Sequence, residues 1–531
     1  MQIDHSNLDE PGEAVRAEVL EEVDQPVNQD SLRKATGQGF SWLSFCLVIG
    51  KCLHFLSQLI LGKILLDEDF GIFAIASSIA MFLRVFNDGG VAQVLVQRGE
   101  SQFSRLSGPA FWIAMSFGLA AGLVLAGIAP LAAYIYDEQK LLPMILLFAI
   151  TMPLSTPSTI FKAKLRMDLR FQTVAWISIV WFMIRYLGVV LFALLGFGVM
   201  SFVIPLPIVA LFELFATYAA TRIKPWRRKL KFREWNEIIG SSFWVMGTAF
   251  FRGLTRNGDY MVLGLLVSKA VLGQYFFGYQ IAVQFALLMA TNIQYVLYPV
   301  MSRLATDPAR QAKAIVRTIR LMILVAAPFS MIVAATIKTI ELLVWQEKWA
   351  LAVPLMQIFA VAAPIRLLPE IVHTVITSRG QFRKSALLVL TEGLLLMLSA
   401  WLAVELFGIN LTQIALFVAS TQVAFSILLT LVILRGYGIR LREVLGAFLP
   451  TWIASAAVAA VTIVISRWYF TGVPLFAQLL LEIGLFSLLF CVLARSLFAN
   501  QLDELASVVP RPLEGLVRRV FFLKRTSMAQ N

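Results

Sequence analysis

The sequence predicts an all-α, polytopic membrane protein with about 14 transmembrane helices, arranged as two six-helix lobes followed by two extra C-terminal helices. Three observations predict this class. Of the 531 residues, 59% are hydrophobic and only 15% carry a charge, far from the balance of soluble domains. Apolar stretches of about 20 residues, long enough to cross a bilayer, recur along most of the chain. The segments between them are too short for a folded soluble domain, so we expect function to reside within the membrane.

Each expected span is an apolar stretch that tolerates a few internal polar positions. In chain order, the expected spans are 38–61, 70–96, 107–133, 141–161, 173–195, 197–221, 238–265, 270–300, 318–340, 350–377, 385–405, 411–434, 445–466 and 475–494. Pro364 and Pro369 in the tenth span, Pro205 and Pro207 in the sixth and Pro299 in the eighth mark places where a helix can bend, although prolines are equally common in rigid membrane bundles. Residues 1–36 are acidic and lack a basic region followed by an apolar one, which favours a disordered cytoplasmic tail over a signal peptide.

Lys and Arg are distributed unevenly between the two predicted sides of the membrane. With the N-terminus inside, 33 of the 45 Lys and Arg residues fall on the cytoplasmic side, 6 on the opposite side and 6 within helices. Positive charge favours the cytoplasmic side, so both termini are predicted to be cytoplasmic. The net charge of +13 is explained by this topology and requires no nucleic-acid partner. The three cysteines lie in apolar segments, without the spacing of a disulfide framework or a metal site.

The most basic connection, 222–237, is predicted to be a cytoplasmic linker between an N-lobe at 37–221 and a C-lobe at 238–434. Residues 435–531 then hold the last two helices and a basic cytoplasmic tail. Internal similarity supports the division into lobes. At a constant offset of 202, the matching residues are Leu61, Gly62, Gly71 and Phe73 with Leu263, Gly264, Gly273 and Tyr275.

The seventh span holds three charged residues near its middle. At about 100° per residue, Arg252, Arg256 and Asp259 lie on one face of a helix. A charge at the centre of a membrane helix costs a few kcal/mol or more, so such residues normally face a bundle interior or an aqueous cavity. This face is therefore a candidate functional site. Under the repeat alignment, Arg256 corresponds to His54 of the first span.

Three stretches resemble a known family: 162–171 (KAKLRMDLRF), 196–202 (GFGVMSF) and the LGxxxxxxxxGxF pattern at 61–73. With the arrangement of two lobes plus two helices, they resemble the Wzx-type oligosaccharide flippases of the polysaccharide biosynthesis family, within the multidrug/oligosaccharidyl-lipid/polysaccharide exporter superfamily. The resemblance implies a V-shaped central cavity and alternating-access transport of an undecaprenyl-diphosphate-linked oligosaccharide across the bacterial inner membrane, for lipopolysaccharide or exopolysaccharide export. The implied partners are this lipid-linked oligosaccharide and membrane lipids, and the hypothesis extends to a polysaccharide polymerase and export machinery.

A diphosphate that crosses the membrane needs cationic partners, and guanidinium groups bind phosphate oxygens through paired hydrogen bonds. The candidates for diphosphate binding are Arg84, Arg252, Arg256 and Arg366. The resemblance implies that the first, second, seventh and eighth helices line the cavity, which favours the first three. Lys51 and Arg185 are weaker candidates, because Lys51 can extend towards the interface and Arg185 has no acidic partner nearby in sequence.

Local ion pairs are the alternative explanation for these charges. Asp88, Asp259 and Glu370 lie three or four residues after Arg84, Arg256 and Arg366, respectively, and could neutralise them. Arg252 is then the clearer anion-binding candidate, and the cargo is expected to contact the C-lobe.

A second set of residues is suited to ion coupling. The candidates are Asp88, Asp259, Glu370, His54 and His373. Ion pairs that only support packing are the alternative, and the sequence does not distinguish proton-coupled, sodium-coupled and uncoupled transport. We expect no cofactor and no structural metal.

Four other functions are alternatives to a flippase of this kind. A lipid II flippase also carries a diphosphate, whereas a multidrug exporter for cationic drugs would favour acidic cavity residues. A membrane-embedded glycan polymerase or ligase would require catalytic groups, usually on a large external loop, and the sequence has neither long outer loops nor a catalytic motif. A pure scaffold would not explain so many costly buried charges. A transporter, not an enzyme, is therefore the favoured class.

Overall fold

The computed structural model describes residues 29–84, 86–87, 90–98, 100–227, 232–304, 307–508, 514–515, 519 and 521. These residues form helices and contain no strand. The first half consists of α2 (Gln29–Ile64), α3 (Asp67–Arg84), α4 (Val91–Arg98), α5 (Glu100–Ile135), α6 (Leu141–Met167), α7 (Phe171–Leu194), η1 (Gly198–Phe202), α8 (Pro205–Thr221) and η2 (Pro225–Arg227). The second half consists of α9 (Phe232–Leu266), α10 (Lys269–Arg303), α11 (Pro308–Val344), η3 (Ala350–Ala352), α12 (Val353–Ala362), η4 (Ile365–Leu367), α13 (Leu368–Ser378), α14 (Phe382–Phe407), α15 (Leu411–Arg435), α16 (Leu441–Tyr469) and α17 (Leu475–Val508).

Most of these helices are long and apolar because, in lipid, a helix satisfies its own backbone hydrogen bonds. Within the described residues, ten helices are long and apolar enough to cross a membrane, or eleven if the bent pair α12 and α13 forms one span. The predicted class, an all-α multi-pass membrane protein, is confirmed. The exact number of fourteen spans stays a prediction. α2 already begins at Gln29, within the segment 1–36 that is predicted to be a tail.

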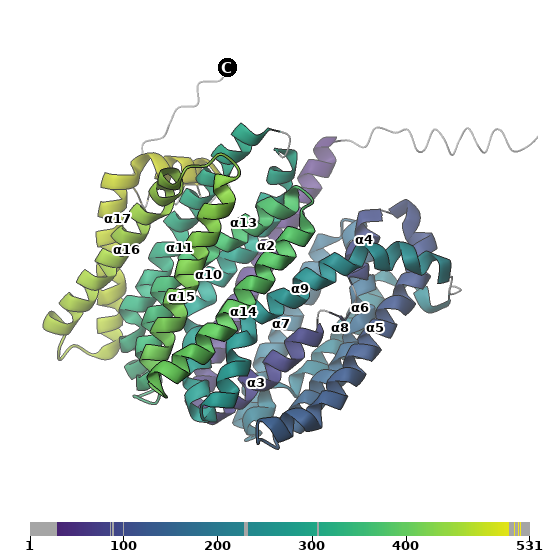
Figure 1. The fold of residues 1–531 in the computed structure, drawn as a ribbon, viewed down its shortest axis with the longest axis horizontal. Coiled ribbons are helices and arrows are strands. Elements are labelled where there is room, and N and C mark those ends of the chain that lie inside the picture. Colours follow the sequence, from purple (N-terminus) through teal and green to yellow (C-terminus); the bar gives the residue numbers. More distant parts are fainter. Residues whose placement is uncertain are drawn as a thin grey trace, which may run out of the picture.

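The helices gather into two groups. In Figure 1, α4, α5, α6 and α8 lie on one side of the molecule, α11, α15, α16 and α17 lie on the other, and α9 runs obliquely between them. Contacts between the groups come from α3, which packs against α9 and α10, and from α2, which packs against α10 as well as α7. These four helices, α2, α3, α9 and α10, carry the residues that match in the internal repeat.

The backbones of α3 and α10 cross at two glycines. A Cβ atom on Gly71 would lie 1.9 Å from the Lys269 carbonyl oxygen, and a Cβ on Gly273 would lie 1.8 Å from the Asp67 carbonyl oxygen. Only glycine permits so close an approach of backbone to backbone. The two glycines are repeat equivalents, and so are Asp67 and Lys269, at the same offset of 202.

A second pair of repeat-equivalent glycines, Gly62 and Gly264, also packs closely against residues that are 202 positions apart. A Cβ on Gly62 would lie 2.6 Å from the Phe277 ring, and a Cβ on Gly264 would lie 2.8 Å from the Ile75 side chain. Ile75 and Phe277 are themselves 202 residues apart. The two halves thus contact each other through equivalent residues, as expected for a pseudo-two-fold axis between the repeats.

The second expected span, 70–96, is interrupted between α3 and α4. Asn87 bonds to α6 here: its side-chain amide donates to Ser155 Oγ at 3.0 Å, and its carbonyl oxygen accepts from Thr156 Oγ1 at 3.1 Å. Gly90, directly before the start of α4, adopts the left-handed φ of +72°, which a continuous helix through this position would not allow. Asp88 lies outside the described residues, so its expected pairing with Arg84 stays a prediction.

The tenth expected span, 350–377, is bent by 52° between η3–α12 and η4–α13. The bend lies at Pro364, one of the positions where the sequence allows a helix to bend. Pro369 lies in the first turn of α13, where its missing N–H costs nothing. The bend matters for the site because it lies close to Arg366, in η4, and Glu370, in α13.

A short loop between α11 and η3, residues 345–349, closes over the α2–α3 turn; we call it the strap. Trp349 is fully buried and its indole N–H donates to the Gly62 carbonyl oxygen at 2.8 Å. The Lys348 ammonium group donates to the Leu65 carbonyl oxygen. Burial lowers the pKa of Lys348, an effect that nearby aspartates oppose. The strap therefore ties the C-terminal end of α11 to the turn between α2 and α3.

Candidate functional site

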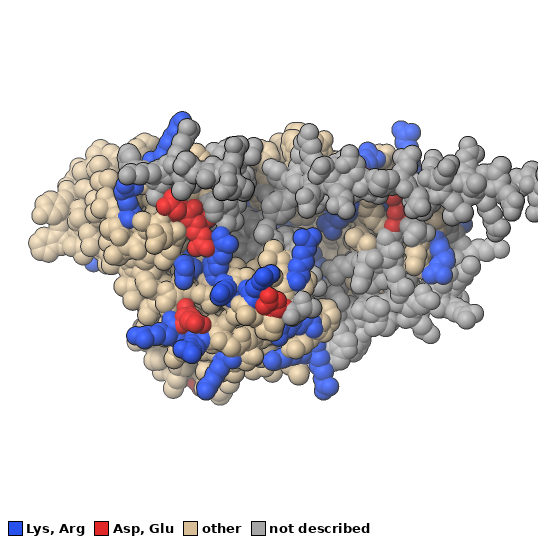
Figure 2. Space-filling model, turned by 90° about the horizontal axis from the view of Figure 1, so that it is seen from above, with Lys and Arg blue, Asp and Glu red and all other residues tan. Residues whose placement is uncertain are grey.

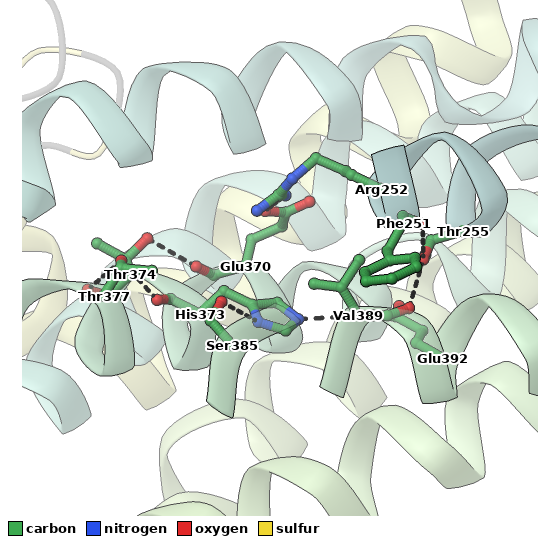
Figure 3. Close-up of polar contacts among 10 residues, drawn as sticks. All are labelled: Phe251, Arg252, Thr255, Glu370, His373, Thr374, Thr377, Ser385, Val389 and Glu392. Carbon is green, nitrogen blue, oxygen red and sulfur yellow. Dashed lines mark hydrogen bonds and ion pairs between the residues drawn. The ribbon is translucent and has the colours of Figure 1, made fainter. Parts of the chain in front are cut away.

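The charged face of α9 contacts two other helices. Arg252 Nη1 lies 2.7 Å from Glu370 Oε2 of α13, and the two side chains are 26% and 21% exposed. One turn along α9, Thr255 donates to the Val389 carbonyl oxygen of α14 at 3.1 Å. Figure 3 shows Arg252 and Glu370 pointing towards each other, with Thr255 turned to α14. Arg252 is thus neutralised by a carboxylate 118 residues away in sequence.

Asp259 points into the protein interior. Its side chain is 2% exposed and accepts hydrogen bonds from the Tyr275 hydroxyl and the Tyr260 N–H, each at 3.0 Å. Arg366 lies close enough to Asp259 to interact with it electrostatically, and its guanidinium group lies 5.3 Å from the centre of the Tyr279 ring. Arg366 and Asp259 therefore stabilise each other within the second half of the chain.

The expected local pairs do not account for these charges. Glu370 of α13 forms an ion pair with Arg252 of α9, so the i, i+4 pair expected between Arg366 and Glu370 is replaced by a contact between two helices. Asp259 is satisfied by tyrosine and lies near Arg366, while the Arg256 side chain is exposed. The expectation that Arg252 is the clearer anion-binding candidate is thus weakened, since Arg252 has a carboxylate partner.

His373 lies in the same region as Glu370 but contacts α14. Its Nδ1 lies 3.3 Å from Ser385 Oγ, and its Nε2 lies 3.6 Å from Glu392 Oε2. Figure 3 shows the imidazole between these two side chains. His373 and Glu392 form an ion pair only when the imidazole is protonated. The arrangement suits a proton-binding role, as expected for His373, with Glu392 as a partner that the sequence did not indicate.

Four basic side chains, Lys51 of α2, Arg84 of α3, Arg185 of α7 and Arg256 of α9, form what we call the cationic cluster. Lys51 lies within electrostatic range of Arg256, and Arg185 lies within range of Arg84. His54 connects the two pairs, since it interacts with both Lys51 and Arg185. Among the residues that the structure describes, none of the four forms an ion pair with a carboxylate.

The contacts that hold Arg185 and His54 are with neutral groups, while Arg256 also lies within electrostatic range of Glu370. Arg185 donates to the Phe202 carbonyl oxygen at 2.8 Å, and the His54 ring lies 5.1 Å from that of Tyr186. Arg84 and Arg256 have exposed side chains. Fixed like charges gathered at the inner contact of the two helix groups repel one another, which favours an anion between them. The geometry thus brings together Arg84, Arg256 and His54 from the predicted set.

From the sequence alone, two members of the cluster, Lys51 and Arg185, are weak candidates for diphosphate binding. No acidic residue lies near Arg185 in sequence. An arginine inside a membrane without a local acidic partner needs a partner from elsewhere, and this is the sequence signal that could have identified Arg185 as a binding candidate. Arg252, Arg366, Glu370 and Asp259 form instead the mutually neutralised group of the second half.

The pairing of Arg252 with Glu370 leads to a testable stability prediction. Because both side chains are about one-quarter exposed, we expect a coupling free energy of about 1–3 kcal/mol, below the value for a fully buried pair. Arg252→Ala and Glu370→Gln should therefore each lower the Tm of the purified protein, and the double variant should lose less than the sum of the two. Strictly additive losses would contradict the pairing.

Comparison with known proteins places this geometry in context. The sequence profile of the family described as "Polysaccharide biosynthesis protein" matches residues 60–354, more than half of the chain. The succinoglycan biosynthesis transport protein ExoT of Rhizobium meliloti (strain 1021) is 24% identical over 317 residues, which cover 59% of this chain and 63% of ExoT, just under two thirds of that protein. The lipopolysaccharide biosynthesis protein WzxC of Escherichia coli (strain K12) is 21% identical over 347 residues, covering 63% of this chain and 68% of WzxC.

Solved structures share the fold. The lipid II flippase MurJ, in an inward closed conformation, superposes with a TM-score of 0.63 at 13% identity, covering 86% of this chain and 99% of MurJ. An outward-facing multidrug resistance transporter of the MATE family, from the MOP superfamily, superposes with a TM-score of 0.54 at 13% identity, covering 75% of this chain and 95% of that one. At these identities the likeness concerns the fold alone.

Proposed function

This chain belongs to the polysaccharide biosynthesis protein family, and from that premise we propose that it is a flippase that moves an undecaprenyl-diphosphate-linked oligosaccharide across the bacterial inner membrane by alternating access. Relatives of the chain carry names that refer to polysaccharide biosynthesis and transport. In this proposal the protein binds and moves its cargo but makes and breaks no covalent bond in it.

The observation that carries the proposal is the cationic cluster. A diphosphate left unpaired in the membrane interior would be prohibitively unstable, so a carrier must supply compensating charge. Lys51, Arg84, Arg185 and Arg256 supply positive charge from four helices, with no ion-paired carboxylate among the described residues. The cargo diphosphate is therefore proposed to bind between the halves, mainly on the side of α2, α3 and α7, with Arg256 as the contribution of the second half.

This charge distribution also favours the proposal over its alternatives. A multidrug exporter for cationic drugs would be hindered by four basic side chains in its path. A lipid II flippase carries the same diphosphate, and only the glycan distinguishes it from the proposed function.

The proposed membrane orientation places both termini in the cytoplasm. Seen from above the view of Figure 1, the described surface carries many Lys and Arg side chains and fewer acidic ones (Figure 2). Such an excess is typical of cytoplasmic surfaces. His373 with Glu392 is proposed as a proton-coupling pair, and Asp259 and Glu370 as supporting carboxylates. A polysaccharide polymerase and export machinery remain proposed partners.

The proposal is tested by deleting the gene and measuring lipid-linked oligosaccharide in the cytoplasmic leaflet. Deletion should cause accumulation, and the wild-type gene should reverse it. The variant with both Lys51→Ala and Arg256→Ala should restore less than about one tenth of export, because each lost charge-assisted contact costs about 1.5–3 kcal/mol. Arg256→Lys should retain partial activity, since it keeps the charge but loses the paired hydrogen bonds.

A matched control removes two cations elsewhere. Arg383 and Lys384 have exposed side chains at the start of α14, so replacing both with alanine should leave export unchanged. Unimpaired glycan export after gene deletion would overturn the function. Full rescue by the Lys51→Ala, Arg256→Ala variant at normal expression would overturn the binding site.

A further inference from the structure

A buried polar cluster lies away from the cationic cluster, where α11, α16 and α17 meet. Glu482 Oε1 accepts hydrogen bonds from Thr339 Oγ1 at 2.7 Å, from Ser466 Oγ at 2.5 Å and from Gln478 Nε2 at 3.1 Å. Thr339 lies near the end of α11, Ser466 near the end of α16, and Gln478 and Glu482 in the first turns of α17. We call these four residues the Glu482 cluster.

Three of the four side chains are buried, and Gln478 is partly exposed. Glu482 and Thr339 are each 2% exposed and Ser466 is 7% exposed. No basic residue in the described part of the chain forms an ion pair with Glu482. Lys338 and Arg467, which adjoin the cluster in sequence, have exposed side chains. A carboxylate at this depth without a cation is costly, so a compensating charge is expected.

The hydrogen bonds around Glu482 are unevenly distributed. Three donors converge on Oε1, whereas Oε2 is buried and accepts no hydrogen bond from the described residues. Gln478 Nε2 also lies 3.3 Å from Thr339 Oγ1 and 3.1 Å from Ser466 Oγ, so its two hydrogens face three oxygens. The oxygen and nitrogen of such an amide are interchangeable by a flip. With the amide flipped, the Gln478 oxygen would face the other three side-chain oxygens.

We propose that the Glu482 cluster is a sodium-binding site. A hard cation is bound by carboxylate, hydroxyl and amide oxygens, and three helices supply all of these here. One carboxylate matches the charge of one monovalent ion, while a divalent ion would leave an uncompensated positive charge in the membrane. In the described residues, no group of three His, Cys, Asp or Glu side chains gathers anywhere to hold a metal ion.

Bound sodium would fasten the last two helices to the rest of the second half. The cluster joins α17 and α16 to the same end of α11 that continues into the strap, and Glu341 of α11 accepts a hydrogen bond from the Trp349 N–H at 3.1 Å. The ion would therefore order the C-terminal end of α11 and, through it, the position of the strap. This role is independent of cargo binding at the cationic cluster.

Sodium binding is measured on the purified full-length protein in detergent, with ²²Na⁺ at pH 8. The wild type should bind about one ion per chain, and NaCl should raise its Tm relative to choline chloride at the same ionic strength, because an ion that binds only the folded state stabilises it. Glu482→Gln should abolish both effects. Thr339→Val and Ser466→Ala, which remove one oxygen each, should weaken binding about tenfold.

The matched control is Glu213→Gln, which neutralises a buried carboxylate that already has Lys162 as its ion-pair partner and should bind sodium as the wild type does. Absence of sodium binding to the wild type, or equal binding by all cluster variants, would overturn the proposal. If Glu482→Gln fails to fold, sodium binding by Thr339→Val and Ser466→Ala tests the proposal instead. Because binding needs no transport, this result is independent of the flippase assay.

Discussion

Replacing Gly71 or Gly273 with alanine is expected to open the contact between α3 and α10. In each variant the new Cβ would lie within 2 Å of a backbone carbonyl oxygen of the facing helix, at 1.9 Å for Gly71 and 1.8 Å for Gly273. Backbone cannot rotate away as a flexible side chain can, so the two helices must separate. Overpacking of this kind costs about 1–3 kcal/mol, which lowers the equilibrium constant for the closed contact by about fivefold to about 150-fold.

Cysteine labelling measures this opening. In a background without Cys46, Cys52 and Cys491, Gln58→Cys places a thiol at a side chain that is 6% exposed, one turn before Gly62 in α2. Under the proposed topology, a membrane-impermeant maleimide applied from outside should label it slowly in the parent protein and about tenfold faster in either glycine variant.

Gly127→Ala is the control, because a Cβ at that position of α5 would meet nothing within 4 Å. Its labelling rate should equal that of the parent protein. Equal labelling in all four proteins would show that the crossing does not control access from the outer side. Labelling that rises in only one glycine variant would contradict the equivalence of the two halves.

The crossing also shows what the sequence can predict. A constant offset of 202 along the chain is enough to single out Gly62, Gly71, Gly264 and Gly273, because helices that approach closely at equivalent positions need glycine at both. The position of the bend in the tenth span is likewise marked in the sequence, since Pro364 and Pro369 act locally. The family resemblance rests on motifs of the same local kind, and it is confirmed by the matching profile.

The partners of the charges are not predictable in this way. Spacing along one helix can rank only pairs three or four residues apart, whereas Arg252 meets Glu370 across 118 residues. The bend before Arg366 is marked by Pro364, but the partner of Glu370 depends on where α13 packs after the bend. Lys51 and Arg185 meet Arg256 and Arg84 only through the packing of α2 and α7, which no sequence period encodes.

Replacing Trp349 with alanine should also open the contact between the two halves, close to the crossing of α3 and α10. Its indole is fully buried, stacks on the Phe277 ring at 3.9 Å between centres, and donates to the Gly62 carbonyl oxygen at 2.8 Å. Removing such a side chain costs about 3–5 kcal/mol, whereas Trp349→Phe keeps the stacking and loses about 1 kcal/mol with the hydrogen bond. Labelling of Gln58→Cys should therefore increase strongly in Trp349→Ala and slightly in Trp349→Phe.

The labelling assay separates a gating role from a purely structural one. If Trp349 only supports the fold, Trp349→Ala should lower the Tm while leaving the labelling rate of the folded protein unchanged. If the strap holds the outer end closed, labelling should accelerate at temperatures well below the Tm. Trp468, which is 78% exposed at the end of α16, provides the control, and Trp468→Ala should change neither quantity. Because Trp349 contacts both Gly62 of α2 and Phe277 of α10, faster labelling would mean that one loop of the second half closes the contact between the two halves.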